Sequence, residues 1–153
     1  MPAQLEKTSS SEMTPKRDRS VEVIMDSNAL FVPLQFKIDI LDELGRLLNR
    51  RFELILLSPV RSEIEMLASE RSPKIRRMAA FAMQLAEKCK YVEVPFSAET
   101  VDNAIIHVAA KNRTPVFTND AQLRKKLRDI SVPVIYVRQK SHLAIEGMIQ
   151  SHV

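Results

Sequence analysis

The sequence predicts an α/β fold in which a mainly parallel central sheet is covered by helices on both faces. Three observations support this prediction. Short apolar runs rich in β-branched residues alternate with longer segments in which apolar residues recur at helical spacing. The short runs are nearly continuous in apolar residues, which is typical of strands buried on both faces. The alternation extends from Val21 to about Val137, and strands that alternate with helices usually form a parallel sheet.

Five segments are predicted to be strands, because each is short, apolar and bounded by residues that favour a turn or a helix start. In chain order they are VEVIM (residues 21–25), ELILL (53–57), YVEV (91–94), PVFT (115–118) and VPVIYV (132–137). Ligands of such sheets bind beyond the carboxyl ends of the strands, near the point where the strand order reverses. Functional residues are therefore expected directly after these segments.

Helices are predicted between the strands, because apolar residues there recur every three or four positions. The stripes are Ile38, Leu41, Leu44 and Leu48; Val60, Ile64 and Leu67; Ile75, Met78, Ala82 and Leu85; Val101, Ile105 and Val108; and Leu123 with Leu127. Pro59 is expected to open the second of these helices, since proline is favoured in a first helical turn.

The chain of 153 residues is long enough for one domain with a real core. Residues 1–20 are rich in serine, threonine and charged residues without periodicity, so a flexible tail is expected there. The folded domain is expected to cover residues 21–140, and a C-terminal tail is expected at residues 141–153.

Composition excludes several classes of site. The single cysteine, Cys89, and three scattered histidines offer no disulfide and no zinc-site spacing. The only glycines are Gly45 and Gly147, so a glycine-rich phosphate loop is absent. No apolar run approaches the roughly 18 residues of a membrane span, so we expect a soluble, cytoplasmic protein. The net charge of +4 suits an anionic partner such as nucleic acid but decides little alone.

Four acidic residues are predicted to meet at the carboxyl ends of the strands. Asp26 follows the first strand directly, and Asp120 follows the fourth. Glu63 lies in the first turns of the helix after the second strand, and Asp102 opens the helix before the fourth strand. Carboxylates gathered at one edge repel one another, and a hard divalent cation is the usual compensation. Mg²⁺ or Mn²⁺ held there leaves coordination positions for a phosphodiester and a water, which is the chemistry of a phosphodiesterase.

Each acid also has an ordinary structural interpretation. Asp26, followed by Ser27 and Asn28, is typical of an Asx turn. Glu63 would be a favourable charge near a helix N-terminus, and Asp102 and Asp120 would be helix caps. Taken singly, these roles are the more common ones, but the coincidence of four acids at one edge favours the metal site.

Helical phase separates neighbouring candidates. Relative to the apolar stripe of its helix, Glu63 lies at the edge of the buried face and Glu65 lies farther toward solvent. In the later helix, Asp102 lies about 65° from the centre of the stripe, whereas Asn103 lies nearly opposite. We therefore expect Glu63 and Asp102, rather than their neighbours, to reach the site.

The segments that follow the predicted strands resemble a PIN domain. DSNAL follows the first strand, SEIEML heads the second helix, VDNAIIHVAA opens a later helix and TNDAQLRKKL follows the next strand. The similarity covers most of residues 21–140. With VPVIYVRQK it looks closest to the archaeal branch related to ribosome-biogenesis PIN nucleases, sometimes filed with VapC-type toxins. Relatives often show two adjacent acids where this chain has Asp102 and Asn103.

The resemblance implies a three-layer PIN-like sandwich and a metal-dependent endoribonuclease that uses Mg²⁺ or Mn²⁺. The implied acids are Asp26, Glu63, Asp102 and Asp120, and the implied site-shaping residues are Asn28, Thr118 and Asn119. Two roles share this chemistry, pre-rRNA processing and a toxin held by an antitoxin. The expected partners are RNA, an antitoxin or a pre-ribosomal particle, and a second copy of the chain. The rival hypothesis is a non-catalytic RNA-binding or assembly module with the same fold.

Basic residues near the predicted acidic edge are candidates for holding RNA phosphates. They are Arg124, Lys125, Lys126 and Arg128 after Asp120, and Arg138 and Lys140 after the last strand. Such contacts supply affinity that depends on salt and not on sequence. The alternative is an ordinary solvated helix face. With no tryptophan and few other aromatic residues, the chain is not expected to offer a base-stacking platform.

Overall fold

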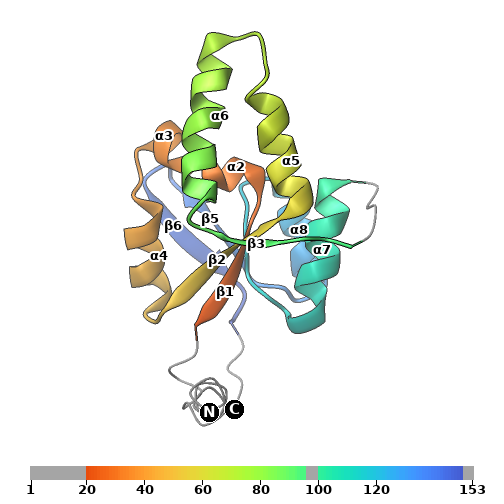
Figure 1. The fold of residues 1–153 in the computed structure, drawn as a ribbon. Helices are drawn as coiled ribbons and strands as arrows, with labels where there is room; N and C mark the ends of the chain where they lie inside the picture. Colours follow the sequence, from red (N-terminus) through yellow and green to blue (C-terminus); the bar gives the residue numbers. More distant parts are fainter. Residues whose placement is uncertain (1–19, 96–99, 150–153) are drawn as a thin grey trace, which may run out of the picture.

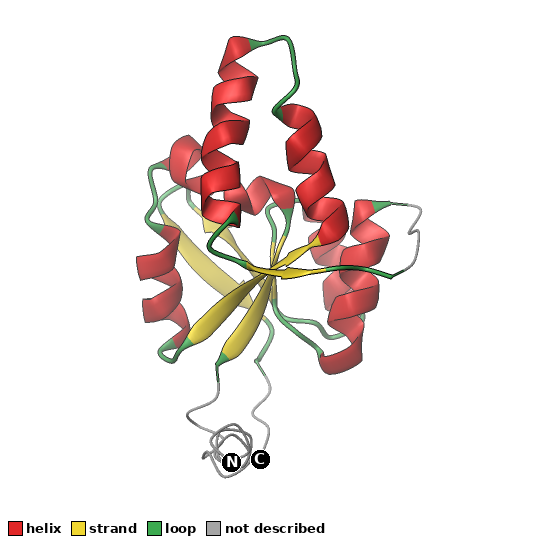
Figure 2. Cartoon of the chain, in the orientation of Figure 1, coloured by secondary structure: helices red, strands yellow, loops and turns green. Residues whose placement is uncertain are grey.

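The strands form one six-stranded sheet in the order β3-β2-β1-β4-β5-β6, with helices around it (Figures 1 and 2). The structure is a computed structural model, and it describes residues 20–95 and 100–149. The strands are β1 (Val21–Met25), β2 (Phe52–Leu57), β3 (Lys90–Val92), β4 (Val116–Phe117), β5 (Val134–Arg138) and β6 (His142–Glu146). The helices are α2 (Ser27–Leu30), α3 (Val32–Phe36), α4 (Ile40–Leu48), α5 (Ser58–Leu67), α6 (Pro73–Ala86), α7 (Val101–Asn112) and α8 (Ala121–Asp129).

The sheet is parallel from β3 to β5, and only β6 runs antiparallel to its neighbour. β1 lies in the middle, with β2 on one side and β4 on the other. The strand order therefore reverses between β1 and β4. In an open α/β sheet this reversal opens a crevice at the carboxyl ends of the two strands.

Helices cover both faces of the sheet, as the alternating pattern predicts. α4 connects β1 to β2, whereas α8 connects β4 to β5 in the opposite direction across the sheet. Because such crossovers are right-handed, opposite directions place the two helices on opposite faces. Figure 1 shows α4 on one side of the sheet and α7 and α8 on the other.

The helices α5 and α6 form a hairpin that projects beyond the carboxyl ends of the strands, at the top of Figure 1. Ser72 caps α6 by accepting a hydrogen bond from the Ile75 N–H at 3.3 Å, and Pro73 occupies the first turn. At the tip, the Arg76 guanidinium donates to the carbonyl oxygens of Glu70 and Arg71. These bonds hold the turn between the two helices.

The core is apolar and centred on the sheet, with Val23, Ile24 and Met25 of β1 almost completely buried. β1 begins and ends where the sequence predicts, and the other four predicted strands differ from the observed ones only at their ends. Two members of the predicted helical stripes, Leu41 and Ile75, are 37% exposed. Along the part of the chain that the structure describes, no helix is both long and apolar enough to cross a membrane.

Three elements differ from the sequence prediction. The short helices α2 and α3 were not predicted, because four or five residues are too few to show a helical period. Residues 141–153 were predicted to be a tail, but residues 142–146 form β6, which pairs with β5 along its whole length. The tail predicted at residues 1–20 falls outside the described residues except for Ser20.

Candidate active site

Asp26 stands at the reversal of the strand order, directly after β1. Its backbone N–H donates to the Phe117 carbonyl oxygen of β4 at 3.0 Å, which ties the end of β1 to β4. The Asp26 side chain is only 4% exposed. Among the residues that the structure describes, Asp26 and Thr118 are the only buried ones with polar or charged side chains. The two buried polar side chains of the fold thus lie together at this crevice.

Both carboxylate oxygens of Asp26 accept hydrogen bonds. Oδ1 accepts from the Ser27 N–H at 2.8 Å, so Asp26 is the N-cap of α2. Oδ2 accepts from the Thr118 hydroxyl at 2.7 Å and from the Asn28 amide at 3.1 Å. The Asp26 carboxylate is therefore held in one orientation by partners from two strand ends.

Asn28 and Asn119 extend this network across three strands. The Asn28 side-chain oxygen accepts from the Asn119 N–H at 2.9 Å, and its amide also donates to Thr118 Oγ1 at 3.3 Å. The Asn119 side-chain oxygen accepts from the Val137 N–H of β5 at 2.8 Å. These contacts place all three residues that the family resemblance implied as site-shaping, Asn28, Thr118 and Asn119, in a frame around Asp26.

Asp120 follows β4 at the same edge and caps α8. Its Oδ1 accepts from the Gln122 N–H at 2.8 Å and from the Leu123 N–H at 3.2 Å. Its own N–H donates to Thr118 Oγ1 at 3.1 Å. Within the described residues, Oδ2 of Asp120 accepts no hydrogen bond, so this oxygen is available to a ligand.

Glu63 and Asp102 come from two helices that contact each other, α5 and α7. Both residues are half-buried, whereas Glu65 and Asn103 are exposed, which agrees with the predicted helical phases. Neither acid serves as a cap. Glu63 lies in the second turn of α5, and the cap of α7 is Thr100, whose hydroxyl accepts from the Asn103 N–H at 3.0 Å.

Electrostatic coupling joins the four acids into one cluster. Burial raises the pKa of Asp26, the bonds from Thr118 and Ser27 partly oppose this, and the charges of Asp102 and Glu63 raise the pKa further. Burial also raises the pKa of Asp102, the charges of Asp120 and Glu63 add to this, and Lys126 opposes it. The structure thus brings Asp26, Glu63, Asp102 and Asp120 together at one edge.

The donor set suits a hard divalent cation, because all four side chains offer carboxylate oxygens, and burial together with the neighbouring negative charges raises the pKa of Asp26 and Asp102. As the side chains stand, no three Asp, Glu, His or Cys residues among those described are grouped tightly enough to enclose a metal ion. Binding would draw the acidic side chains closer together, and Oδ2 of Asp120 could take part without the loss of a hydrogen bond.

The basic residues predicted to bind RNA divide between two surfaces. Arg124 and Arg128 turn toward β6, where their guanidinium groups lie 3.7 and 3.8 Å from Glu146 Oε1. The Arg124 guanidinium also stacks over the Tyr136 ring, with its carbon 3.8 Å from the ring centroid. These two arginines hold α8 to the β5–β6 hairpin.

The other four basic residues are exposed, and Lys126 carries the charge that acts on Asp102. Lys125 is its neighbour on the outer side of α8. Arg138 ends β5 and Lys140 lies in the turn after it, at the same edge of the sheet as Asp26. Sequence reasoning did not separate these from Arg124 and Arg128, because the partner Glu146 lies in the segment predicted to be a tail.

The chain matches the family model described as a PIN like domain over residues 23–140. It is 35% identical over 129 residues to Ribonuclease VapC4 of Methanocaldococcus jannaschii, a match that covers 84% of this chain and 98% of the relative. It is 27% identical over 123 residues to Ribonuclease VapC9 of Archaeoglobus fulgidus, covering 80% of this chain and 87% of the relative.

Solved structures show the same fold. The PIN domain endonuclease Utp24 superposes with a TM-score of 0.69 at 23% identity, covering 85% of this chain and 94% of that one. A domain of a functionally unknown protein from Methanocaldococcus jannaschii superposes with a TM-score of 0.56 at 17% identity, covering 88% and 99% of the two chains. At these identities, the likeness establishes the fold.

Proposed function

This chain belongs to the PIN-like domain family, and from that premise we propose that it is a metal-dependent endoribonuclease that hydrolyses RNA phosphodiester bonds. The observation that carries the proposal is the cluster of four acids from separate elements at the reversal of the strand order. The ribonuclease names of the two relatives supply the substrate class.

The residues that would hold the metal are Asp26, Glu63, Asp102 and Asp120, and Mg²⁺ or Mn²⁺ is the ion that such oxygen ligands suit. A bound cation of this kind lowers the pKa of a water and stabilises charge on the phosphate. Asp26 is the best oriented of the four, since Thr118, Asn28 and Ser27 all donate to its oxygens. Lys126, whose charge acts on Asp102, is suited to hold a phosphate beside the acids.

A non-catalytic RNA-binding module is the rival function. A cluster of acids whose charges raise the pKa of Asp26 and Asp102 costs stability and repels RNA phosphates, so a module that only binds RNA gains nothing from it. This observation favours the nuclease.

For the biological role, the VapC names of the relatives favour a toxin held by an antitoxin over pre-rRNA processing. The RNA is the proposed substrate, and the antitoxin is the proposed protein partner. Co-purification of the tagged protein from its own cells separates the two roles, since a small antitoxin supports the first and a pre-ribosomal particle the second.

The direct test combines cleavage with metal binding. We expect labelled single-stranded RNA to be cut with Mn²⁺ or Mg²⁺ and left intact with excess EDTA. A ligand at a hundred times its dissociation constant stabilises a protein by about 2.7 kcal/mol, so Mn²⁺ should raise the melting temperature by several degrees.

The Mn²⁺-induced shift in melting temperature should be smaller at pH 5 than at pH 7. The raised pKa values of Asp26 and Asp102 keep more protons on these groups at pH 5, and a cation must displace them.

Two results would contradict the proposal. Cleavage that continues in EDTA would exclude the proposed mechanism. A melting shift of equal size at both pH values would place the cation elsewhere.

Glu63 and Glu65 form a matched pair of substitutions on α5. Glu63→Gln is expected to lower metal-dependent cleavage at least about tenfold, because a group that holds or orients a metal ligand typically contributes 10- to 100-fold. Glu65→Gln should have little effect, since Glu65 is exposed and pairs with Arg61 at 3.3 Å. Cleavage rates of the two purified variants provide the comparison, and equal losses would contradict the assignment of Glu63.

Lys125 and Lys126 are expected to act on RNA binding. Changing both to glutamine should flatten the dependence of log affinity on log salt by up to about 1.4 units, since each contact to single-stranded RNA contributes about 0.7. Arg124→Gln is the contrasting variant, because it removes the stacking on Tyr136 and the pair with Glu146. It should lower stability by about 1 kcal/mol and leave the salt slope almost unchanged. An unchanged slope in the double lysine variant would mean that Lys125 and Lys126 lie on an ordinary solvated helix face and do not contact RNA.

A further inference from the structure

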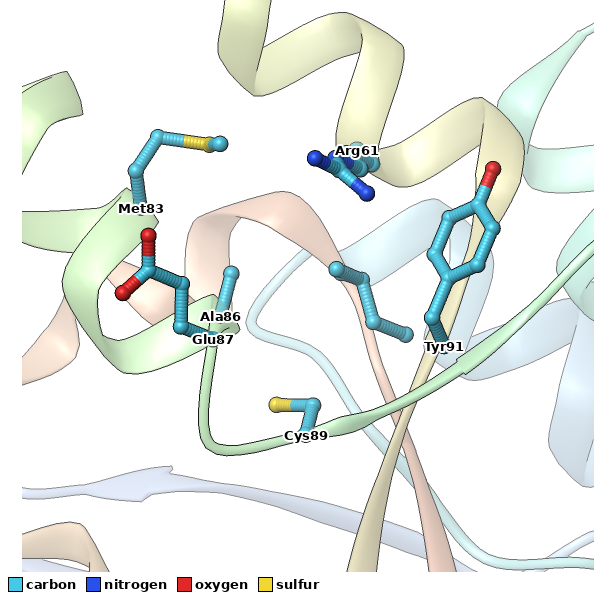
Figure 3. A pocket seen from close by; sticks show the side chains of 7 residues that line it. Arg61, Met83, Ala86, Glu87, Cys89 and Tyr91 are labelled. Carbon is cyan, nitrogen blue, oxygen red and sulfur yellow. The ribbon is translucent and has the colours of Figure 1, made fainter.

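A pocket of about 240 Å³ opens beside α5, apart from the acidic cluster (Figure 3). It is lined by Arg61, Met83, Ala86, Glu87, Cys89 and Tyr91, together with Leu56 of β2. Figure 3 shows the Arg61 guanidinium between Met83 on one side and Tyr91 on the other. None of the four acids lines this pocket, so it is a separate site.

The lining combines an aromatic ring, a guanidinium group, the Glu87 carboxylate and an apolar wall. The Arg61 guanidinium carbon lies 5.2 Å from the centroid of the Tyr91 ring, and Tyr91 is 44% exposed. Met83 and Ala86 contribute apolar surface. Burial raises the pKa of Cys89 to about 11, so its thiol is uncharged at neutral pH and belongs to the same apolar wall.

This combination suits a nucleotide. Unpaired bases bind proteins by stacking on aromatic side chains and on arginine planes, while the attached phosphate attracts cations. Arg61, which also pairs with Glu65 at 3.3 Å, supplies one cation, and the exposed Lys88 and Lys90 lie on either side of Cys89 in the chain. One tyrosine is too little for an extended stacking platform, but it is enough for a single base.

We propose that this pocket binds one unpaired nucleobase of the RNA, which stacks on Tyr91 while the neighbouring phosphate lies near Arg61. The inference rests on the proposed ribonuclease function and adds a specificity site to it. The nucleotide held here makes cleavage depend on the identity or the accessibility of one base near the cut.

The position of α5 places this base close to the bond that is cleaved. Arg61 and Glu63 are two residues apart, so their side chains leave the helix about 200° apart and about 3 Å apart along its axis. Glu63 reaches the acidic cluster and Arg61 reaches the pocket. The two sites are therefore separated by the width of one helix, about 10–12 Å.

Cys89 provides a reporter for occupancy, because it lines the pocket and is the only cysteine in the chain. The experiment measures the rate at which a small maleimide labels Cys89 in the full-length Asp26→Asn protein, in which RNA should remain intact. The raised pKa makes labelling slow at neutral pH, so mildly alkaline buffer is used. A saturating unstructured oligoribonucleotide should slow labelling several-fold, whereas inorganic polyphosphate, which has no bases, should not.

Two substitutions at one position test the stacking itself. Tyr91→Ala should weaken binding of the oligoribonucleotide roughly 5- to 150-fold, the range that corresponds to 1–3 kcal/mol of stacking per base. Tyr91→Phe keeps the ring and should bind like the parent protein. In an otherwise unchanged protein, Tyr91→Ala should also alter the distribution of cleavage sites on a mixed-sequence RNA.

The outcomes separate the pocket from the nuclease. RNA cleavage with unchanged sites and affinity in Tyr91→Ala would overturn the base pocket and leave the nuclease standing. Base-dependent protection of Cys89 without cleavage by the unsubstituted protein would leave the pocket standing and overturn the nuclease. Equal protection by polyphosphate would mean that only phosphate is bound, and protection by an aromatic peptide but not by RNA would assign the pocket to a protein partner. Either of these last two results would overturn the proposed base pocket.

Discussion

Asp26→Asn is expected to abolish RNA cleavage, with a loss of about 1,000-fold or more. A metal ion contributes several kcal/mol of transition-state stabilisation, and each 1.4 kcal/mol changes the rate tenfold. The substitution keeps the shape of the side chain but removes the charge and turns one oxygen into a donor. The new NH2 group would face the side-chain NH2 group of Asn28, which in the parent protein donates to Asp26 Oδ2 at 3.1 Å. Two donors cannot bond to each other, so the frame also loses one hydrogen bond. Initial rates with saturating Mn²⁺ measure the effect.

The fold offers a matched control in Asp39, another aspartate at a helix N-terminus. Asp39 caps α4 by accepting from the Asp42 N–H at 3.2 Å, but it is exposed and takes no part in the acidic cluster. Asp39→Asn should therefore cut RNA at the parent rate. Thermal melts of both variants separate a chemical loss from unfolding. If Asp26→Asn remains folded and active, Asp26 is a helix cap and not a catalytic group.

Asp102→Asn is expected to lower cleavage on the order of 100-fold, while Asn103→Ala should stay within about twofold of the parent protein. Asp102 interacts electrostatically with Asp26, Glu63 and Asp120, which is the reason for assigning it to the site. Asn103 is exposed on α7, and the bond that caps this helix uses its backbone N–H, which alanine keeps. Asp102 is only half-buried, whereas Asp26 is almost completely buried and is oriented by three hydrogen-bond donors, so the loss should be smaller than at Asp26.

Metal titration adds a second readout for this pair. The Mn²⁺-induced rise in melting temperature should shrink in Asp102→Asn and persist in Asn103→Ala. The reverse pattern, with Asn103→Ala inactive and Asp102→Asn active, would mean that the side chain of Asn103 reaches the reacting groups. In that case the exposed face of α7, and not its half-buried edge, would border the RNA.

The layout of the fold followed from local patterns wherever an element was long enough to show its period. β1 is apolar from Val23 to Met25 and was predicted in full, and Pro59 lies in the first turn of α5 as expected. β6 was missed because residues 142–146 contain a histidine, an alanine and a glutamate and form an edge strand, which is partly exposed. Its position depends on pairing with β5, which no local pattern reveals.

In the candidate site, too, local sequence patterns predicted some residues but not the contacts between them. Asp26 and Asp120 were found because a residue that directly follows a strand has a known place in a parallel sheet. The bonds from Thr118 to Asp26 and from Asn119 to Asn28 join residues 92 and 91 positions apart, and they depend on the order of the strands. The contact of Arg124 with Glu146 needed β6, which was not predicted. The pocket around Tyr91 left no signal, because its lining comes from four separate elements and the chain between them.

The single antiparallel strand has a practical consequence for handling the protein. β1 starts at the amino-end edge of the sheet, and β6 returns the chain to that edge, with Glu146 opposite Val134 at the start of β5. The described chain therefore enters and leaves on the side away from Asp26 and Asp120, as the lower part of Figure 1 shows. Fluorescent fusion partners or surface tethers joined directly before Ser20 or directly after Ile149 would start from that far side. A protein immobilised at either of these two points would present its carboxylates to solution, so tethering at each point in turn should give the same cutting rate.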